Sequence, residues 1–136
     1  MNMRAQGTFT TKNFKPTTTT LVPMIETALP SSVSNMEKVY SGDVTGHSST
    51  LFTAAFDLSS GIGSYIALEA FSGSLLNKNG AFNFIHSAST QGNNRTDEFF
   101  SIVFGSGTED LKGIHGEGGM AIDGDGTHRI WFDFEL

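Results

Sequence analysis

The chain has 136 residues, enough for one domain with a buried core, and it carries no cysteine, which excludes disulfides, cysteine-ligated zinc and thiol nucleophiles. Its formal net charge is −6 and no cluster of Lys or Arg offsets it, so no nucleic-acid partner is expected. No secretory leader opens the chain and no apolar run approaches the roughly 18 residues of a membrane span, so we expect a single cytoplasmic domain with no membrane association.

The first half of the chain predicts strands that are interrupted by one long loop. Residues 5–12 alternate between two faces, residues 32–41 place Met36 and Tyr40 on one face, and residues 50–58 form another strand after a turn at 42–46. Between the first two strands, residues of about 13–31 contain all three prolines and four consecutive threonines. This composition predicts an irregular loop, with an extended piece at 21–25 or a short helix at 24–29 as alternatives.

The second half predicts hairpins. Strands are expected at 64–75 and 81–89, on either side of an Asn79-Gly80 turn signal, and at 97–105. Residues 105–119 contain six glycines and predict a β-turn-β unit whose second strand runs over about 112–122. A turn at 123–126 precedes a last strand at 128–136, which alternates Ile, Phe, Phe and Leu with Trp, Asp and Glu.

About eight strands with short links and no convincing helix predict an all-β fold. Closing eight antiparallel strands into a single barrel removes the sheet edges and leaves room for side chains or one small ligand. The 12 phenylalanines, against one tryptophan and two tyrosines, predict a dry interior. A β-sandwich is the alternative, because alternation alone does not distinguish the two.

Several stretches together resemble one bacterial family. The sequences SGDVTG at 41–46, SYIALEAFSGSL at 64–75, GAFNFIHSAS at 80–89, GSGTEDLKGIHGEGG at 105–119 and the final FDFEL are similar to the family named domain of unknown function 3224. The resemblance covers nearly the whole chain from about residue 6. It implies an eight-stranded barrel like that of allene oxide cyclase and of dirigent-type proteins, and it implies no assigned activity. His115 stands where the family commonly has Arg.

One carboxylate in the strand at 64–75 is the main candidate for chemistry. Tyr65, Glu69 and Phe71 share one face of that strand, and Phe84 and His86 share one face of the next. If both faces point inward, an interior Glu69–His86 pair could act as a general acid and base. The same pair could instead only fix strand register, or Glu69 could face outward. We predict that Glu69 lies inside and hydrogen-bonds Tyr65, His86 or Glu117.

Other motifs favour no cofactor or metal. His115 and Glu117 could share a strand face, but no third ligand follows at a recognisable spacing. The glycines at 105–107 lack the residues of a phosphate-binding loop, and the Asp123 to Asp125 segment lacks the remaining positions of a calcium loop. The segment 123–126 is therefore expected to be a hairpin turn.

Three functions remain open for such a barrel. It could bind a small hydrophobic molecule inside, it could be an isomerase or cyclase that uses the interior Glu/His pair, or it could be filled and serve as a platform for partners. The candidate interior residues are Tyr65, Glu69, Phe71, Phe84, His86 and Glu117. The strand at 97–104 is apolar on both faces, so we also expect a homo-oligomer, most simply a dimer.

Overall fold

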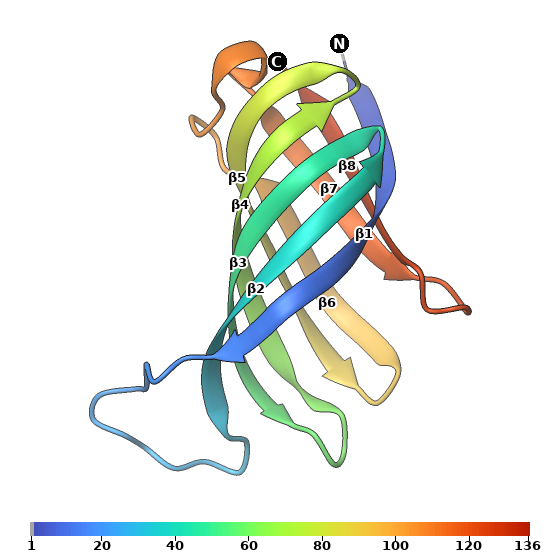
Figure 1. The fold of residues 1–136 in the computed structure, drawn as a ribbon. Coiled ribbons are helices and arrows are strands. Elements are labelled where there is room, and N and C mark those ends of the chain that lie inside the picture. The colour runs from blue at the N-terminus through green and yellow to red at the C-terminus, as the bar shows by residue number, and fades with distance from the viewer. Residues whose placement is uncertain (1) are drawn as a thin grey trace.

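A computed structural model describes residues 2–136 as one sheet of eight antiparallel strands that closes into a barrel (Figure 1). Each strand pairs with the next one along the chain, and β1 pairs with β8, so the predicted barrel is confirmed and the sandwich is wrong. The only helical element of residues 2–136 is one 3-10 turn, η1 (Glu109–Leu111). The strands are β1 (Met3–Pro16), β2 (Ser31–Gly42), β3 (Val44–Asp57), β4 (Ile62–Leu75), β5 (Lys78–Gln91), β6 (Asn94–Ile102), β7 (His115–Ile122) and β8 (His128–Glu135).

Burial alternates along the strands, as a closed barrel requires. In β5 every second residue from Gly80 to Ala88 is buried. In β8 the inward residues are Ile130, Phe132 and Phe134, and the residues between them lie on the outer surface. No helix among residues 2–136 is long and apolar enough to cross a membrane.

The N-terminal loop is shorter than predicted. β1 continues to pair with β2 beyond an irregularity between Lys12 and Lys15, so the irregular segment is 17–30 rather than about 13–31. It holds neither the extended piece nor the helix considered for it. The turn predicted at 42–46 is confirmed but is tighter than expected, because Gly42 adopts a φ of +110° and a single residue, Asp43, links β2 to β3.

The glycine-rich segment does not form a β-turn-β unit. Residues 103–114, which we call the plug, instead close one end of the barrel. After β6 ends at Ile102, the backbone N–H groups of Val103 and Thr108 donate to carbonyls of β5 at 2.8 and 2.9 Å, so the segment covers the β5 edge that β6 leaves. The fully buried side chains of Leu111 and Ile114 then enter the barrel. At Gly107 a Cβ would lie 1.9 Å from the Leu111 carbonyl oxygen, which only glycine avoids. β7 consequently begins at His115.

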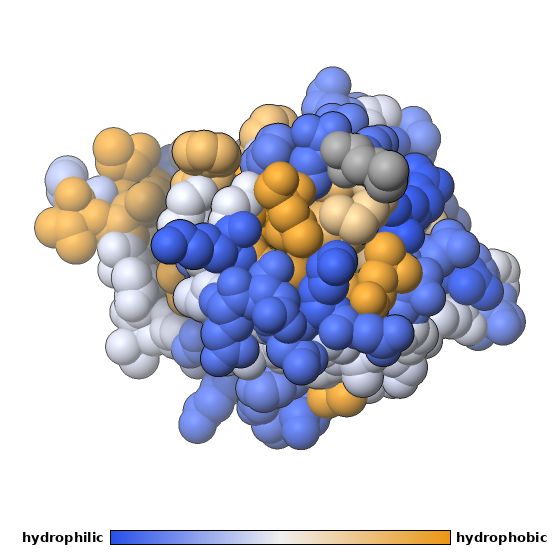
Figure 2. All heavy atoms as spheres, turned by 90° about the horizontal axis from the view of Figure 1, so that it is seen from above, coloured by the Kyte–Doolittle hydropathy of each residue, from blue (hydrophilic) through white to orange (hydrophobic). Residues whose placement is uncertain are grey.

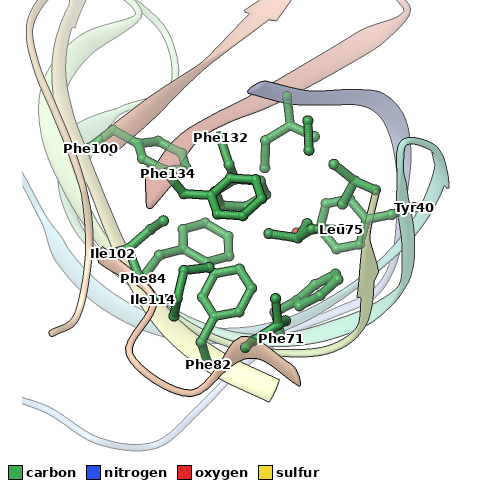
Figure 3. Packing of buried hydrophobic residues seen from close by; sticks show 14 of the residues in the cluster. Tyr40, Phe71, Leu75, Phe82, Phe84, Phe100, Ile102, Ile114, Phe132 and Phe134 are labelled. Carbon is green, nitrogen blue, oxygen red and sulfur yellow. The ribbon is translucent and has the colours of Figure 1, made fainter. Parts of the chain in front are cut away.

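The two ends of the barrel therefore differ. The plug and both termini lie at one end, at the top of Figure 1, and the 17–30 loop and three hairpin turns lie at the other. Figure 2 views the terminal end from above and shows mainly hydrophilic residues around it. Directly inside this end the barrel is filled by packed aromatic and aliphatic side chains (Figure 3), and the largest fully buried ones are Phe71, Leu75, Phe84, Leu111, Ile114, Ile130, Phe132 and Phe134.

Candidate ligand-binding cavity

A cavity of about 330 Å³ occupies the barrel interior at the end away from the plug. The residues around it come from all eight strands and from no part of the plug, and they mix aromatic, aliphatic and basic side chains. They are Phe9, Thr11, Phe14, Met36, Lys38, Phe52, Tyr65, Ala67, His86, Arg95, Met120, Ala121, Ile122 and His128. The interior is thus filled at one end and hollow at the other.

Aromatic rings in contact form one wall of this cavity. Phe14 meets Phe52 with ring centroids 6.3 Å apart, Phe52 stacks on Tyr65 at 5.1 Å, and Tyr65 meets His86 edge to face at 5.5 Å. Burial raises the pKa of the Tyr65 phenol, which therefore stays protonated at neutral pH. Such a wall offers flat apolar surface with a few polar edges, which suits a planar ligand.

The inner end of the cavity meets a buried polar cluster, which we call the polar floor and which consists of Lys38, Tyr40, Ser48, Thr50 and Glu69. The Lys38 ammonium donates to Glu69 Oε2 at 2.9 Å. The hydroxyls of Thr50, Ser48 and Tyr40 lie 2.9, 3.1 and 3.2 Å from Glu69 Oε1 and donate to it. The Glu69 side chain is fully buried, so these four donors replace the water that a carboxylate would otherwise require.

The electrostatics of the floor keep its tyrosine neutral. Burial raises the pKa of Tyr40 well above its usual value, and the negative charge of Glu69 raises it further. The Tyr40 hydroxyl is therefore a donor at neutral pH, as its bond to Glu69 requires. Tyr40 Oη also lies 3.0 Å from Ser48 Oγ, but each hydroxyl has one proton and donates it to Glu69, so the Glu69 carboxylate connects the floor.

A second polar group joins β5 to β6 and reaches β7 through Arg95. His86 Nε2 is 2.7 Å from Glu98 Oε2, and the Arg95 guanidinium lies 3.3 Å from the same oxygen. Arg95 also donates to the backbone carbonyl of Met120 on β7. Only one residue pair, at Ser101, joins β6 to β7 through the sheet, so the Arg95 contact helps close the barrel.

The stability of the protein is expected to fall as the pH drops below about 6.5, because His86 is buried neutral. Burial lowers the pKa of His86, and the nearby charges of Lys38 and Arg95 lower it further, although Glu98 opposes the shift. As the pH falls, the unfolded chain therefore binds a proton on this histidine at a higher pH than the folded protein does. The contribution of His86 to stability is present above about pH 6.5 and is lost as the pH falls towards the lower pKa of the folded state. Ring-proton NMR titration should show a His86 pKa below that of an unfolded peptide. A pKa above it would contradict the prediction.

The predicted interior residues separate into three groups. Tyr65 and His86 line the cavity, whereas Phe71 and Phe84 belong to the packed end. Glu69 points inward, as predicted, but it lies in the polar floor and bonds none of the three partners named for it. The prediction that Glu69 pairs with His86 is therefore wrong, and His86 bonds Glu98 instead.

Glu117 corrects the prediction in a second way, because it lies on the outer surface of β7 rather than inside. It borders an outer groove of about 640 Å³ along β6 to β8, where His115 lies 3.3 Å from Glu135. This groove is larger than the interior cavity, but it lies on the outer surface, and four of its eleven lining residues are acidic. Among residues 2–136 no three His, Asp or Glu side chains are grouped so that they could hold a metal ion.

Lys38 is the main site residue that sequence reasoning missed. It lies between Met36 and Tyr40 in β2, two residues from each, and therefore on the face that these two residues mark. The alternation along this strand therefore places Lys38 on the same face as Met36 and Tyr40. If that face points inward, the lysine needs a buried acidic partner. Arg95, whose polar neighbours suggest a loop, lies near the start of β6.

The fold and the site together define an antiparallel eight-stranded barrel that is packed at one end and hollow at the other. The chain belongs to the DUF3224 family, described as a protein of unknown function, whose model matches residues 5–134. It is similar to a crystal structure of a DUF3224 protein of unknown function from Shewanella oneidensis MR-1, with 20% identity and a TM-score of 0.86 over 100% of this chain and 98% of that one. At this identity the likeness shows the fold alone. No curated protein matches the chain.

Proposed function

We propose that the protein binds a small, largely apolar molecule in the cavity at the open end of the barrel. The observation that carries this proposal is a hollow of about 330 Å³ in a barrel whose other end is closely packed. Ligand pockets of proteins commonly span about 300–1,000 Å³ and combine apolar walls with a few polar groups. The aromatic wall and the polar floor supply both.

The alternative functions have less support. A cyclase that uses Glu69 with His86 lacks its pair, because both Glu69 oxygens are occupied by the polar floor and His86 bonds Glu98. A barrel filled throughout would leave only its outer surface for function, whereas the cavity leaves room at one end.

Filling the cavity should abolish the binding of an apolar probe. Ala67 is buried, lies on β4 and borders the cavity, so Ala67→Trp should place an indole in the space that a ligand would use. We expect the affinity for N-phenyl-1-naphthylamine, measured by its fluorescence, to fall at least about tenfold. The control is Ala70→Trp, an exposed position on the outer face of the same strand, which should leave the affinity unchanged. Wild-type protein that binds no probe would contradict the proposed function.

We also propose that the protein forms a homodimer, in which the outer surface of β3 to β6 is the interface. Leu51, Leu68 and Ile85 are direct neighbours across β3, β4 and β5, and Ile66 lies two residues from Leu68. On β6, Phe99 is 54% exposed and adjoins the same patch through Ser87. An apolar patch that crosses four strands is typical of an association surface, and two copies can pair through it symmetrically.

A charge in this patch should prevent association. Leu68 is 46% exposed at the centre of the patch, so Leu68→Lys should convert a dimer into a monomer without affecting the interior. Sedimentation velocity at tens of micromolar would show the change in mass. The matched control is Val39→Lys, because Val39 is similarly exposed but lies on β2, outside the patch. Wild-type protein that sediments as a monomer would overturn the proposed dimer.

A further inference from the structure

Lys38 presents a buried positive charge to a cavity whose walls are mainly aromatic and aliphatic. The residue is only 4% exposed and borders the cavity, and its ammonium lies 4.8 Å from the centroid of the Phe9 ring. An ammonium group has three N–H donors. Among residues 2–136, Glu69 Oε2 is the one hydrogen-bond acceptor that Lys38 Nζ meets, so the group retains capacity to donate to a bound molecule.

The charges around the floor are already balanced. Lys38 is matched by Glu69, and Arg95 is matched by Glu98. A ligand carboxylate at the floor would add a negative charge close to Glu69 with no further cation to offset it, and burying such a charge is costly. A neutral oxygen acceptor would add no charge. Because an ammonium accepts no hydrogen bond, a ligand group that only donates would not match it.

We propose that the cavity selects neutral, planar apolar molecules that carry a carbonyl oxygen, and that Lys38 Nζ donates a hydrogen bond to this oxygen. The carbonyl lies at the floor, and the apolar body of the molecule lies against Phe52 and Tyr65. This inference rests on the proposed function, since it names the ligand class of the same cavity. It makes Lys38 the group that orients the ligand and Glu69 the group that holds Lys38 in place.

The test compares three probes that share one ring system. These are 2-acetylnaphthalene, which carries a ketone, 2-ethylnaphthalene, which lacks the oxygen, and 2-naphthoate, which carries a charge. Equilibrium dialysis gives the affinity of each for the wild-type protein and for Lys38→Met combined with Glu69→Gln. The double variant removes both charges together, so it avoids leaving one buried ion without a partner. Ratios between probes within one variant cancel general changes in the cavity.

The wild-type protein should bind the ketone about tenfold more tightly than the hydrocarbon, the scale of one hydrogen bond to a charged donor. It should bind the naphthoate less tightly than the ketone. In the double variant, the ratio of ketone to hydrocarbon affinity should fall to within about twofold. Equal wild-type affinities for ketone and hydrocarbon would overturn the role of Lys38 but leave the proposed function intact. Tightest binding of naphthoate would overturn the neutral ligand class, and no binding of any probe would overturn both proposals.

Discussion

Replacing Glu69 by alanine is expected to lower the free energy of unfolding by about 3–5 kcal/mol, the cost of leaving one member of a buried ion pair alone. The substitution leaves the Lys38 ammonium in a buried site without its carboxylate, and among residues 2–136 its Nζ then retains only the face of the Phe9 ring. It also removes the acceptor of the Ser48 and Thr50 hydroxyls. Urea unfolding, followed by circular dichroism, measures the loss.

Two variants show whether this loss comes from the unpaired charge. Glu117→Ala removes a carboxylate from the outer surface of β7, and it should change stability by less than about 0.5 kcal/mol. Lys38→Met combined with Glu69→Gln removes both charges, and it should cost less than Glu69→Ala alone, under about 2 kcal/mol. If the double variant is the less stable of the two, the unpaired ammonium is not the cause of the loss, and the ion pair itself contributes to stability.

The fold could be predicted from the sequence because alternation along each strand is a local property. A period of two predicts which side chains of β5 and β8 point inward, and these include Phe82, Phe84, Ile130, Phe132 and Phe134. The plug could not be predicted in this way. Its conformation depends on the β5 edge that receives its hydrogen bonds and on the space that Leu111 fills, and both are set by strands distant in the sequence.

The candidate site was predicted only in part, because its contacts depend on strand register. Parity placed Glu69 and His86 inside the barrel, but the register of β4 and β5 sets Glu69 opposite Phe84 and His86 opposite Ala67. The ion-pair partner of Glu69, Lys38, comes from β2, which is two strands away, across β3. Residues that are neighbours across the interior of a barrel, rather than along its sheet, are determined by stagger and closure, which no local pattern encodes.

Replacing Phe132 by alanine is expected to destabilise the packed end of the barrel by about 3–5 kcal/mol, the usual range for truncating a buried phenylalanine. Phe132 is fully buried, and its ring lies 5.1–5.5 Å from the rings of Phe82, Phe84 and Phe100. Truncation removes all of these contacts at once, and closely packed neighbours cannot collapse fully into the space.

The loss at Phe132 should also be graded by volume and confined to the interior. Phe132→Leu keeps most of the side chain, so it should cost roughly half as much or less. Phe99→Ala removes a ring of the same size from the outer surface of β6, where it is 54% exposed, and it should cost less than about 1 kcal/mol in the monomer.

Urea unfolding of the three variants would compare them directly, at a protein concentration low enough to keep any dimer dissociated. Equal losses for Phe132→Ala and Phe99→Ala would mean that Phe132 does not hold the packed end together. The expected order follows from burial alone, because the inward ring gives up contacts on every side whereas the outward ring already meets solvent.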